Sequence, residues 1–266
     1  MTISSHFYEA YLKCPTKCFL RALGEMGTGN AYADWVRTQN ASYRTEESQR
    51  LRQRATRDQC VIGPPAAANL KSAKWNLAID LTVRTDHLQS TIHAVERVVS
   101  QERGKPTQLI PIRFIYADRL TREDRLLVAF DALVLSETLG REVGLGKIIH
   151  GDKSATLEVK TGALASEVRK RTEKISALLS SKSPPDLVLN RHCPECEFQT
   201  QCRQSYRGRR PQPLIRDDGE GTREPPQQGN LHRHAAVLHF QTSQNAKEGK
   251  EPCQASLHGT AGARDP

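Results

Sequence analysis

The 266-residue sequence contains no hydrophobic run long enough to cross a membrane, and its first residues, MTISSHFYEAYLKC, include no apolar leader. A membrane-spanning helix needs about 20 mostly apolar residues, and a secretory leader needs an apolar stretch of about 7 to 15. No internal repeat is visible either. These absences predict a soluble, cytoplasmic protein with no membrane partner. In that compartment the seven cysteines stay reduced, which favours metal or redox chemistry over a disulfide framework.

The chain has an excess of positive charge. The formal net charge is +9 and the isoelectric point is near 9.3. A basic protein attracts anionic partners, and nucleic acid is favoured over a membrane or an acidic protein because phosphate neutralisation releases counterions. Solvated helix faces account for such charge equally well. The candidate phosphate-binding residues are Arg113, Arg119, Arg122, Arg125 and the cations of EVRKRTEK at 167–174.

Along the first 206 residues, segments with the hydrophobic spacing of helices are followed by segments with the alternating pattern of strands. A first helix is broken at Pro15, which leaves Cys14 at the break. From residue 31 to about 57 the spacing predicts an amphipathic helix, and we expect its aromatic residues to be core contacts. These positions on one face are Tyr32, Trp35, Val36 and Tyr43.

Strand patterns occupy the middle of the chain, in NLAIDLTV, TIHAVERV and LIPIRFIY, and the last two are expected to form a hairpin. Thr121 and Asp124 form a capping-box pattern that opens a helix closed by Gly140. Two strands, GKIIHG and ATLEVK, and a helix ended by Pro184 and Pro185 follow. The order predicts an α/β domain over residues 1–206, with a mixed sheet of about five strands flanked by helices.

Residues 207–266 are polar and without periodicity. Such a segment buries too little apolar surface to offset its ordering entropy, so it is predicted to be a disordered tail. Its His232, His234, His239 and Cys253 show no metal-site spacing.

The stretch RHCPECEFQTQC at 191–202 contains three cysteines, Cys193, Cys196 and Cys202, in a C-x2-C-x5-C spacing. Three thiolates leave a tetrahedral site one ligand short. Cys14 or Cys18 is a candidate for the fourth ligand, which would bring the two ends of the domain together. Thiolates suit zinc or an iron-sulfur cluster, and zinc also accepts His192.

The order of these elements resembles the RecB-like nucleases of the PD-(D/E)XK superfamily. The likeness extends from about residue 4 to 205, from YLKCP to CPECEFQTQC, and is strongest to the iron-sulfur CRISPR-associated exonuclease and to nuclease domains that precede a helicase. It implies a restriction-endonuclease-like fold in which four cysteines hold a 4Fe-4S cluster that joins the N- and C-terminal segments. The implied ligands are Cys14, Cys193, Cys196 and Cys202, with Cys18 as a substitute for Cys14.

The resemblance also implies positions for a magnesium or manganese site, and none of them matches. The family's Asp falls near His93, its acidic-x-Lys triplet falls on residues 113–115, and its Gln-x3-Tyr falls on Leu126 and Phe130. Residues 104–117 contain no carboxylate, so this strand offers no acidic ligand for a magnesium site. His93 suits a softer metal than magnesium, and Glu96 is a candidate displaced ligand.

A literal acidic-x-Lys triplet, Glu158-Val159-Lys160, occurs later, with Asp131 or Asp152 upstream. Chain order argues against this triplet, because it follows the long helix that the family places after its motif. Glu158 and Lys160 are kept as candidate catalytic residues beside His93 and Glu96.

The sequence therefore predicts a protein of RecB-like nuclease fold that acts on or binds DNA, in single-stranded form, with a helicase as a further partner. Its hydrolytic motifs are degenerate. If it is an enzyme, it is a metal-dependent DNA nuclease that uses magnesium or manganese. The alternatives are a non-enzymatic, zinc-stapled interaction module and a truncated remnant of a nuclease-helicase protein.

Overall fold

The computed structural model of the chain describes residues 2–55, 59–63, 70, 74–99, 107–181 and 183–209. The predicted tail lies outside these residues from 210 onward. The helices of the described part are α1 (Ser5–Lys13), α2 (Pro15–Ala22), α3 (Ala31–Arg54), α4 (Arg122–Leu139), α5 (Ala165–Ser180) and α6 (Gln199–Arg209). Two short 3-10 turns, η3 (Gly162–Leu164) and η4 (Cys193–Glu195), complete them.

A mixed sheet of seven strands forms the centre of the described residues, in the order β2-β3-β4-β5-β6-β7, with β1 paired to β4. The β2–β3 and β5–β6 pairs are parallel, as is β1–β4, whereas the other neighbours are antiparallel. The strands are β1 (Ile3–Ser4), β2 (Cys60–Ile62), β3 (Leu77–Arg84), β4 (Leu88–Val98), β5 (Gln108–Ile115), β6 (Leu145–His150) and β7 (Ala155–Lys160).

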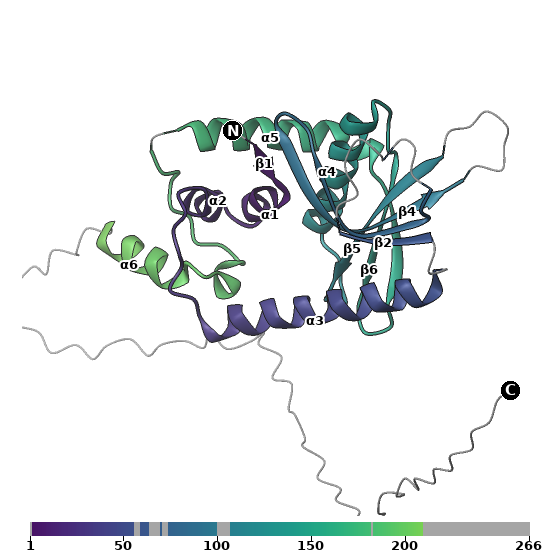
Figure 1. Cartoon of the computed structure of the whole chain (residues 1–266). Coiled ribbons are helices and arrows are strands. Elements are labelled where there is room, and N and C mark those ends of the chain that lie inside the picture. The colour runs from purple at the N-terminus through teal and green to yellow at the C-terminus, as the bar shows by residue number, and fades with distance from the viewer. Residues whose placement is uncertain are drawn as a thin grey trace, which may run out of the picture. The chain divides into compact units, whose positions relative to one another are not determined.

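Helices cover both faces of the sheet (Figure 1). On one face, α1, α4 and α5 share the larger apolar core with Leu81, Ile92 and Val95 of the sheet. On the other face, α3 runs along the strands and buries Tyr43 in a smaller core with Ile79, Ile112 and neighbouring residues. The domain is thus an α/β sandwich of the kind that the alternation of periods predicts.

Local chemistry explains where the helices begin and end. Pro15 opens α2 at its first position, and Cys14 separates α1 from α2 in an extended conformation. Thr121 and Asp124 cap α4 reciprocally. Gly140 ends α4 with φ +69°, a left-handed conformation that glycine adopts without strain.

Two expectations from the sequence require correction. The sheet of the described part has seven strands rather than about five, because the two- and three-residue strands β1 and β2 are too short to show a period. The aromatic residues of α3 also differ. Tyr43 is buried, but Tyr32 and Trp35 are 51% and 53% exposed, so they are surface residues rather than core contacts. None of the helices in the described part is both long and apolar enough to span a bilayer.

Candidate cofactor pocket and cleft

Ion pairs to Glu197 join the two ends of the described domain. The Lys17 ammonium lies 2.7 Å from Oε2 of Glu197, and the Arg21 guanidinium lies 2.7 Å from Oε1. Burial opposes ionisation of Glu197, but the hydrogen bond from Lys17 and the two neighbouring cations outweigh it and lower its pKa to about 2. The carboxylate therefore holds α2 against the segment that carries three of the cysteines.

The backbone of the segment between α2 and α3 also contacts this loop. The Gly29 amide donates to the Glu197 carbonyl at 3.1 Å, and the Asn30 side-chain amide donates to the Cys196 carbonyl at 3.0 Å. At Gly27 a Cβ would lie only 2.5 Å from the Glu197 carbonyl oxygen. A glycine is needed at that position because the two backbones approach so closely. We call residues 13–30 and 187–202 together the end junction.

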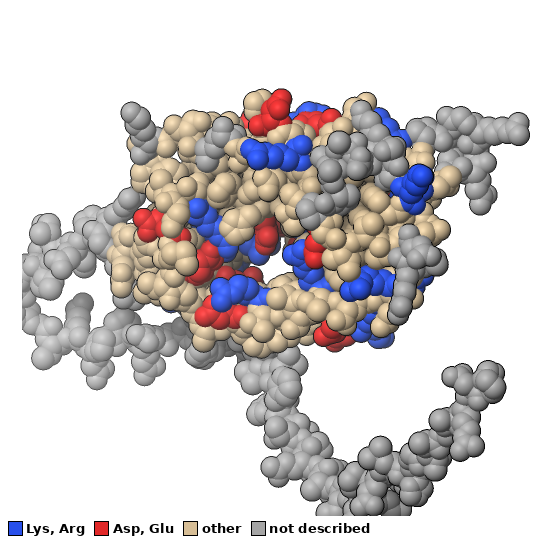
Figure 2. All heavy atoms as spheres, in the orientation of Figure 1, with Lys and Arg blue, Asp and Glu red and all other residues tan. Residues whose placement is uncertain are grey.

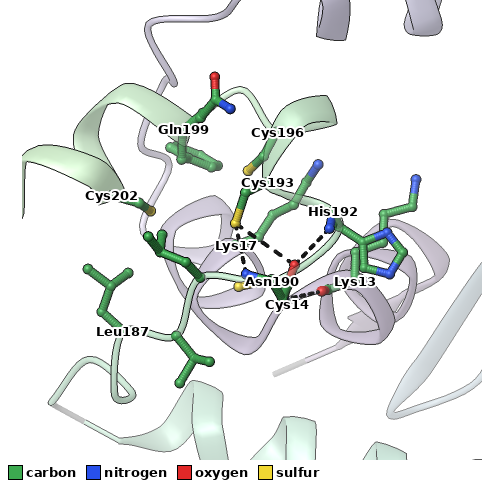
Figure 3. Close-up of a pocket in the computed structure, with 13 residues that line it drawn as sticks. Lys13, Cys14, Lys17, Leu187, Asn190, His192, Cys193, Cys196, Gln199 and Cys202 are labelled. Carbon is green, nitrogen blue, oxygen red and sulfur yellow. Dashed lines mark hydrogen bonds between the residues drawn. The ribbon is translucent and has the colours of Figure 1, made fainter. Parts of the chain in front are cut away.

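Four cysteines of the end junction line one narrow pocket, in which Cys14 comes from the N-terminal helices and Cys193, Cys196 and Cys202 come from the C-terminal segment (Figure 3). The local sequence pattern had singled out the three C-terminal cysteines, and the family resemblance implied Cys14 as the fourth. Cys18, the substitute for Cys14, is fully buried and does not line the pocket. The other lining residues are Lys13, Lys17, Leu187, Val188, Leu189, Asn190, His192, Phe198 and Gln199.

Burial and neighbouring thiols favour the protonated form of Cys196 and Cys202 when no cation is near. Burial, together with the nearby thiols of Cys196, Cys14 and Cys193, raises the pKa of Cys202 to about 11. Burial likewise raises the pKa of Cys196. The charge on one of these thiols therefore affects the ionisation of the others. A bound cation would lower the pKa values that burial raises, because metal ions bind cysteine as the thiolate.

The donor set of the pocket suits a thiolate-bound metal centre. Among the described residues no carboxylate lines it, and Lys13 and Lys17 would offset part of the negative charge of four thiolates. The Asn190 amide already donates a hydrogen bond to Cys193 Sγ at 3.2 Å, a contact that stabilises metal-bound sulfur. In the side-chain positions of the described residues, no group of three or more His, Cys, Asp or Glu side chains is arranged to hold a metal ion. Ligation therefore requires the thiols to turn towards a common centre.

A second cavity, a cleft of about 730 Å³, lies between the N-terminal helices, α3, the sheet and the loop at 195–198. Figure 2 shows the hollow in this face, with side chains of both charges around it. Six cations and six carboxylates line the cleft, so its charges balance. They are Lys13, Lys17, Arg21, Arg37, Arg44 and Arg113, and Glu9, Glu25, Glu123, Asp124, Glu195 and Glu197.

An ion pair buried beneath the cleft joins the sheet to α4. Arg113 of β5 donates through Nε and Nη2 to the two carboxylate oxygens of Asp131, the latter at 2.6 Å. The Ser90 hydroxyl of β4 donates to the same carboxylate. Arg113 is 5% exposed and Asp131 is fully buried. The carboxylate of Asp131 is therefore occupied by protein donors.

His93 lies beside Arg113 where β4 and β5 stop pairing. The regular register ends at Ala94 opposite Ile112, and the Phe114 amide donates instead to Nδ1 of His93 at 3.1 Å. On the other side, Asp80 of β3 lies opposite His93 with a positive φ of 57° and forms an ion pair with Arg44 of α3. Asp80, His93 and Arg113 thus form a polar row across three strands, which we call the cleft floor together with Asp131.

The remaining candidate catalytic residues lie elsewhere. Glu158 and Lys160 are exposed on β7, the outer strand of the sheet, and neither lines the cleft. Glu96 forms an ion pair with Lys147 at 2.7 Å and does not line the cleft either. Of the four, the structure places only His93 in the cleft.

Sequence reasoning missed Glu197, and it considered Asp131 only as an acid upstream of the Glu158 triplet, not as the partner of Arg113. For Asp131 a signal was present, because it is a single acid in the apolar helix LLVAFDALVL, and Arg113 is a single cation in the apolar strand LIPIRFIY. Charged residues are almost never fully buried unless they are paired, so two opposite charges in buried elements predict a pair. No comparable signal marks Glu197.

The sequence matches no protein-family model and no curated protein. Among solved structures, the chain is similar to one titled "Crystal structure of SSO0001", with 14% identity and a TM-score of 0.31 over 50% of this chain. The match spans 65% of that other chain, which is less than two thirds of its length. A likeness of this strength carries no argument about function.

Proposed function

We propose that the chain is a RecB-like protein of the PD-(D/E)XK superfamily that binds single-stranded DNA, carries a 4Fe-4S cluster and lacks the magnesium-dependent hydrolytic centre. One observation carries the proposal. The four cysteines that the resemblance requires come from opposite ends of the described domain and line a single pocket. The mixed α/β sheet beside that pocket is compatible with the restriction-endonuclease-like fold.

The residues that would hold the cluster are Cys14, Cys193, Cys196 and Cys202. When bound, the cluster would supply a cross-link between the two ends of the described domain, a structural role that does not require electron transfer. Lys17, Arg21 and Glu197 already hold the two segments together and would position the thiols for ligation.

The cleft floor supports a protein without hydrolysis. A magnesium site needs several hard oxygen ligands, such as carboxylates, around a position open to the substrate. The floor offers His93 and Arg113, and both of its carboxylates already have protein partners. Asp131 is bound by Arg113 and Ser90, and Asp80 is paired with Arg44. Glu158 and Lys160 are on the outer strand, outside the cleft.

Single-stranded DNA is the proposed ligand because exposed aromatic side chains lie on the same helix as cleft residues. Tyr32 and Trp35 of α3 stack on each other with ring centroids 5.9 Å apart, and both are about half exposed. Arg37 and Arg44 of the same helix line the cleft. Aromatic faces combined with cations are the usual platform for unpaired bases. A helicase is the protein partner that the resemblance implies.

The test is fluorescence anisotropy with single-stranded oligonucleotides, together with a cleavage assay in magnesium and in manganese. We expect salt-dependent binding that weakens several-fold in Trp35→Ala protein, and no cleavage. Tyr116→Ala, which changes another exposed aromatic residue, is the control. A metal-dependent cut that disappears in Glu158→Ala or Glu96→Ala protein would overturn the absence of hydrolysis. Absence of DNA binding at low salt would overturn the DNA-binding function.

A zinc-stapled interaction module is the second candidate, favoured by the narrowness of the cysteine pocket. Four thiolates suit a single tetrahedral zinc ion, and His192 also lines the pocket. Elemental analysis of anaerobically purified protein separates the two cofactors. Iron with acid-labile sulfide and visible absorption supports the cluster, whereas colourless protein that contains zinc supports the module.

A further inference from the structure

The cleft floor presents two N–H donors that face each other. Nη1 of Arg113 lies 3.4 Å from Nε2 of His93. The direction of this contact depends on which imidazole nitrogen carries the proton. The other ring nitrogen decides it, because a backbone amide can only donate and the Phe114 amide points at Nδ1 from 3.1 Å. Nδ1 is therefore the acceptor, and a neutral His93 ring carries its proton on Nε2.

The ring is neutral at physiological pH. Burial lowers the pKa of His93 well below its usual value, and the nearby charges of Arg113 and Arg44 act in the same direction. The contact between His93 Nε2 and Arg113 Nη1 is thus between two donors and is not a hydrogen bond. Among the described residues, Nη1 has no other partner, since Nε and Nη2 of the guanidinium are bound to Asp131.

We infer that the cleft floor binds a phosphate oxygen directly, between His93 Nε2 and Arg113 Nη1, without a metal ion. Both atoms belong to residues that line the cleft, and an oxyanion accepts from both donors at once. This arrangement satisfies a buried guanidinium N–H that the described part of the protein leaves without an acceptor. That DNA provides this phosphate rests on the proposed function. Binding of inorganic phosphate does not depend on it.

The surroundings of the donor pair set the strength of the site. Arg44 adds a cation, although Asp80 pairs with it. Glu9 opposes an anion, because it also lines the cleft and acts electrostatically on Arg113, and Lys13 at 3.1 Å only partly offsets it. Loss of the Glu9 charge should therefore tighten phosphate binding.

The experiment is calorimetric titration of the full chain with inorganic phosphate at pH 7.5 in the presence of EDTA, with chloride as the reference anion. We expect saturable binding that weakens about tenfold or more in His93→Phe protein. His93→Gln should keep most of the affinity, because its amide oxygen accepts from the Phe114 amide and its NH2 donates to the anion. Glu9→Gln should bind more tightly. His87→Phe changes an exposed histidine outside the cleft and is the matched control.

Unchanged phosphate binding in His93→Phe protein, or no binding in the unmodified protein, would overturn the inference. Binding of oligonucleotides separates it from the proposed function. If DNA binds His93→Phe and the unmodified protein equally well, the DNA-binding function stands and the phosphate site fails. If phosphate binds as expected but no oligonucleotide does, the phosphate site stands and the DNA-binding function fails.

Discussion

The end junction and the cleft floor are both built from ionisable side chains, but they differ in how those side chains are partnered. On the cleft floor, Asp131 receives donors from Arg113 and Ser90. In the end junction, four thiols line one pocket, and backbone amides donate to two of them, from Asn190 to Cys193 and from Phe198 to Cys196. A metal ion adds little stability to a site whose carboxylates are already paired with protein donors. A metal ion strongly stabilises a group of thiols, because it binds them as thiolates.

The largest expected effect concerns the thiols. If the pocket holds the proposed cluster, Cys14→Ser protein should lose its iron, because serine is a poor ligand for this centre and no fifth thiol of the described residues lines the pocket. Cys18→Ser should keep its iron, since Cys18 is buried outside the pocket and burial raises its pKa to about 12. Iron and acid-labile sulfide analysis with visible absorption spectra measures both. Equal loading of the Cys14→Ser and unmodified proteins would remove Cys14 as a ligand.

The next effect concerns the buried ion pair. Asp131→Ala should lower the free energy of unfolding by about 3 to 5 kcal/mol, because Arg113 is left charged and unpaired in the core. Glu137→Ala on the same helix removes a partner of Arg169, which is 58% exposed, and should change stability by less than about 1 kcal/mol. Urea unfolding of both variants gives the two values. Equal effects would mean that the cleft floor does not depend on this pair.

Sequence patterns predicted what depends on local period or on spacing within one segment. The capping box at Thr121, the break at Pro15 and the strands β3 to β7 all fall in this class. The pairing of Arg113 with Asp131 depends on how β5 packs against α4. The exposure of Trp35 depends on where α3 meets the sheet. Both depend on tertiary packing, which the hydrophobic spacing within one segment cannot specify.

The cysteine pocket is an intermediate case. The three cysteines at 193–202 are a local pattern, and only a resemblance chose Cys14 over Cys18. In the structure Cys14, which separates α1 from α2, lines the pocket, whereas Cys18 is buried within α2 and does not line it. Glu197, which fastens the two segments, has no sequence signal because its partners Lys17 and Arg21 are some 180 residues away in the chain.

A smaller effect on stability distinguishes the two ways in which the segments of the end junction can be held together, by the ion pairs of Glu197 or by a cofactor. The pKa of Glu197 is about 2 in the folded protein, below its ordinary value of 4.5, so its contribution is fully present above pH 4.5 and is lost as the pH falls towards 2. Glu197→Gln should lower the free energy of unfolding at pH 7 by on the order of 2 kcal/mol, with the difference shrinking below pH 4.

Glu195→Gln, an exposed neighbour for which no ion pair is found among the described residues, is the control for this measurement. Chemical unfolding at pH 7, 4 and 3 gives the comparison. A difference between Glu197→Gln and unmodified protein that grows as the pH falls would contradict the role assigned to the carboxylate.

The smallest expected effect acts through the backbone alone. Gly27→Ala places a methyl group 2.5 Å from the Glu197 carbonyl oxygen and should cost about 1 to 3 kcal/mol, because one backbone must move. Gly144→Ala is the matched control, since its Cβ would meet nothing closer than 3.7 Å. Thermal unfolding of both variants, before and after cofactor removal, is the measurement. If the end junction holds the thiols in place, Gly27→Ala should also lower cofactor content although it changes no ligand. Full cofactor content with unchanged stability would show that the close approach of residues 27 and 197 does not position the pocket.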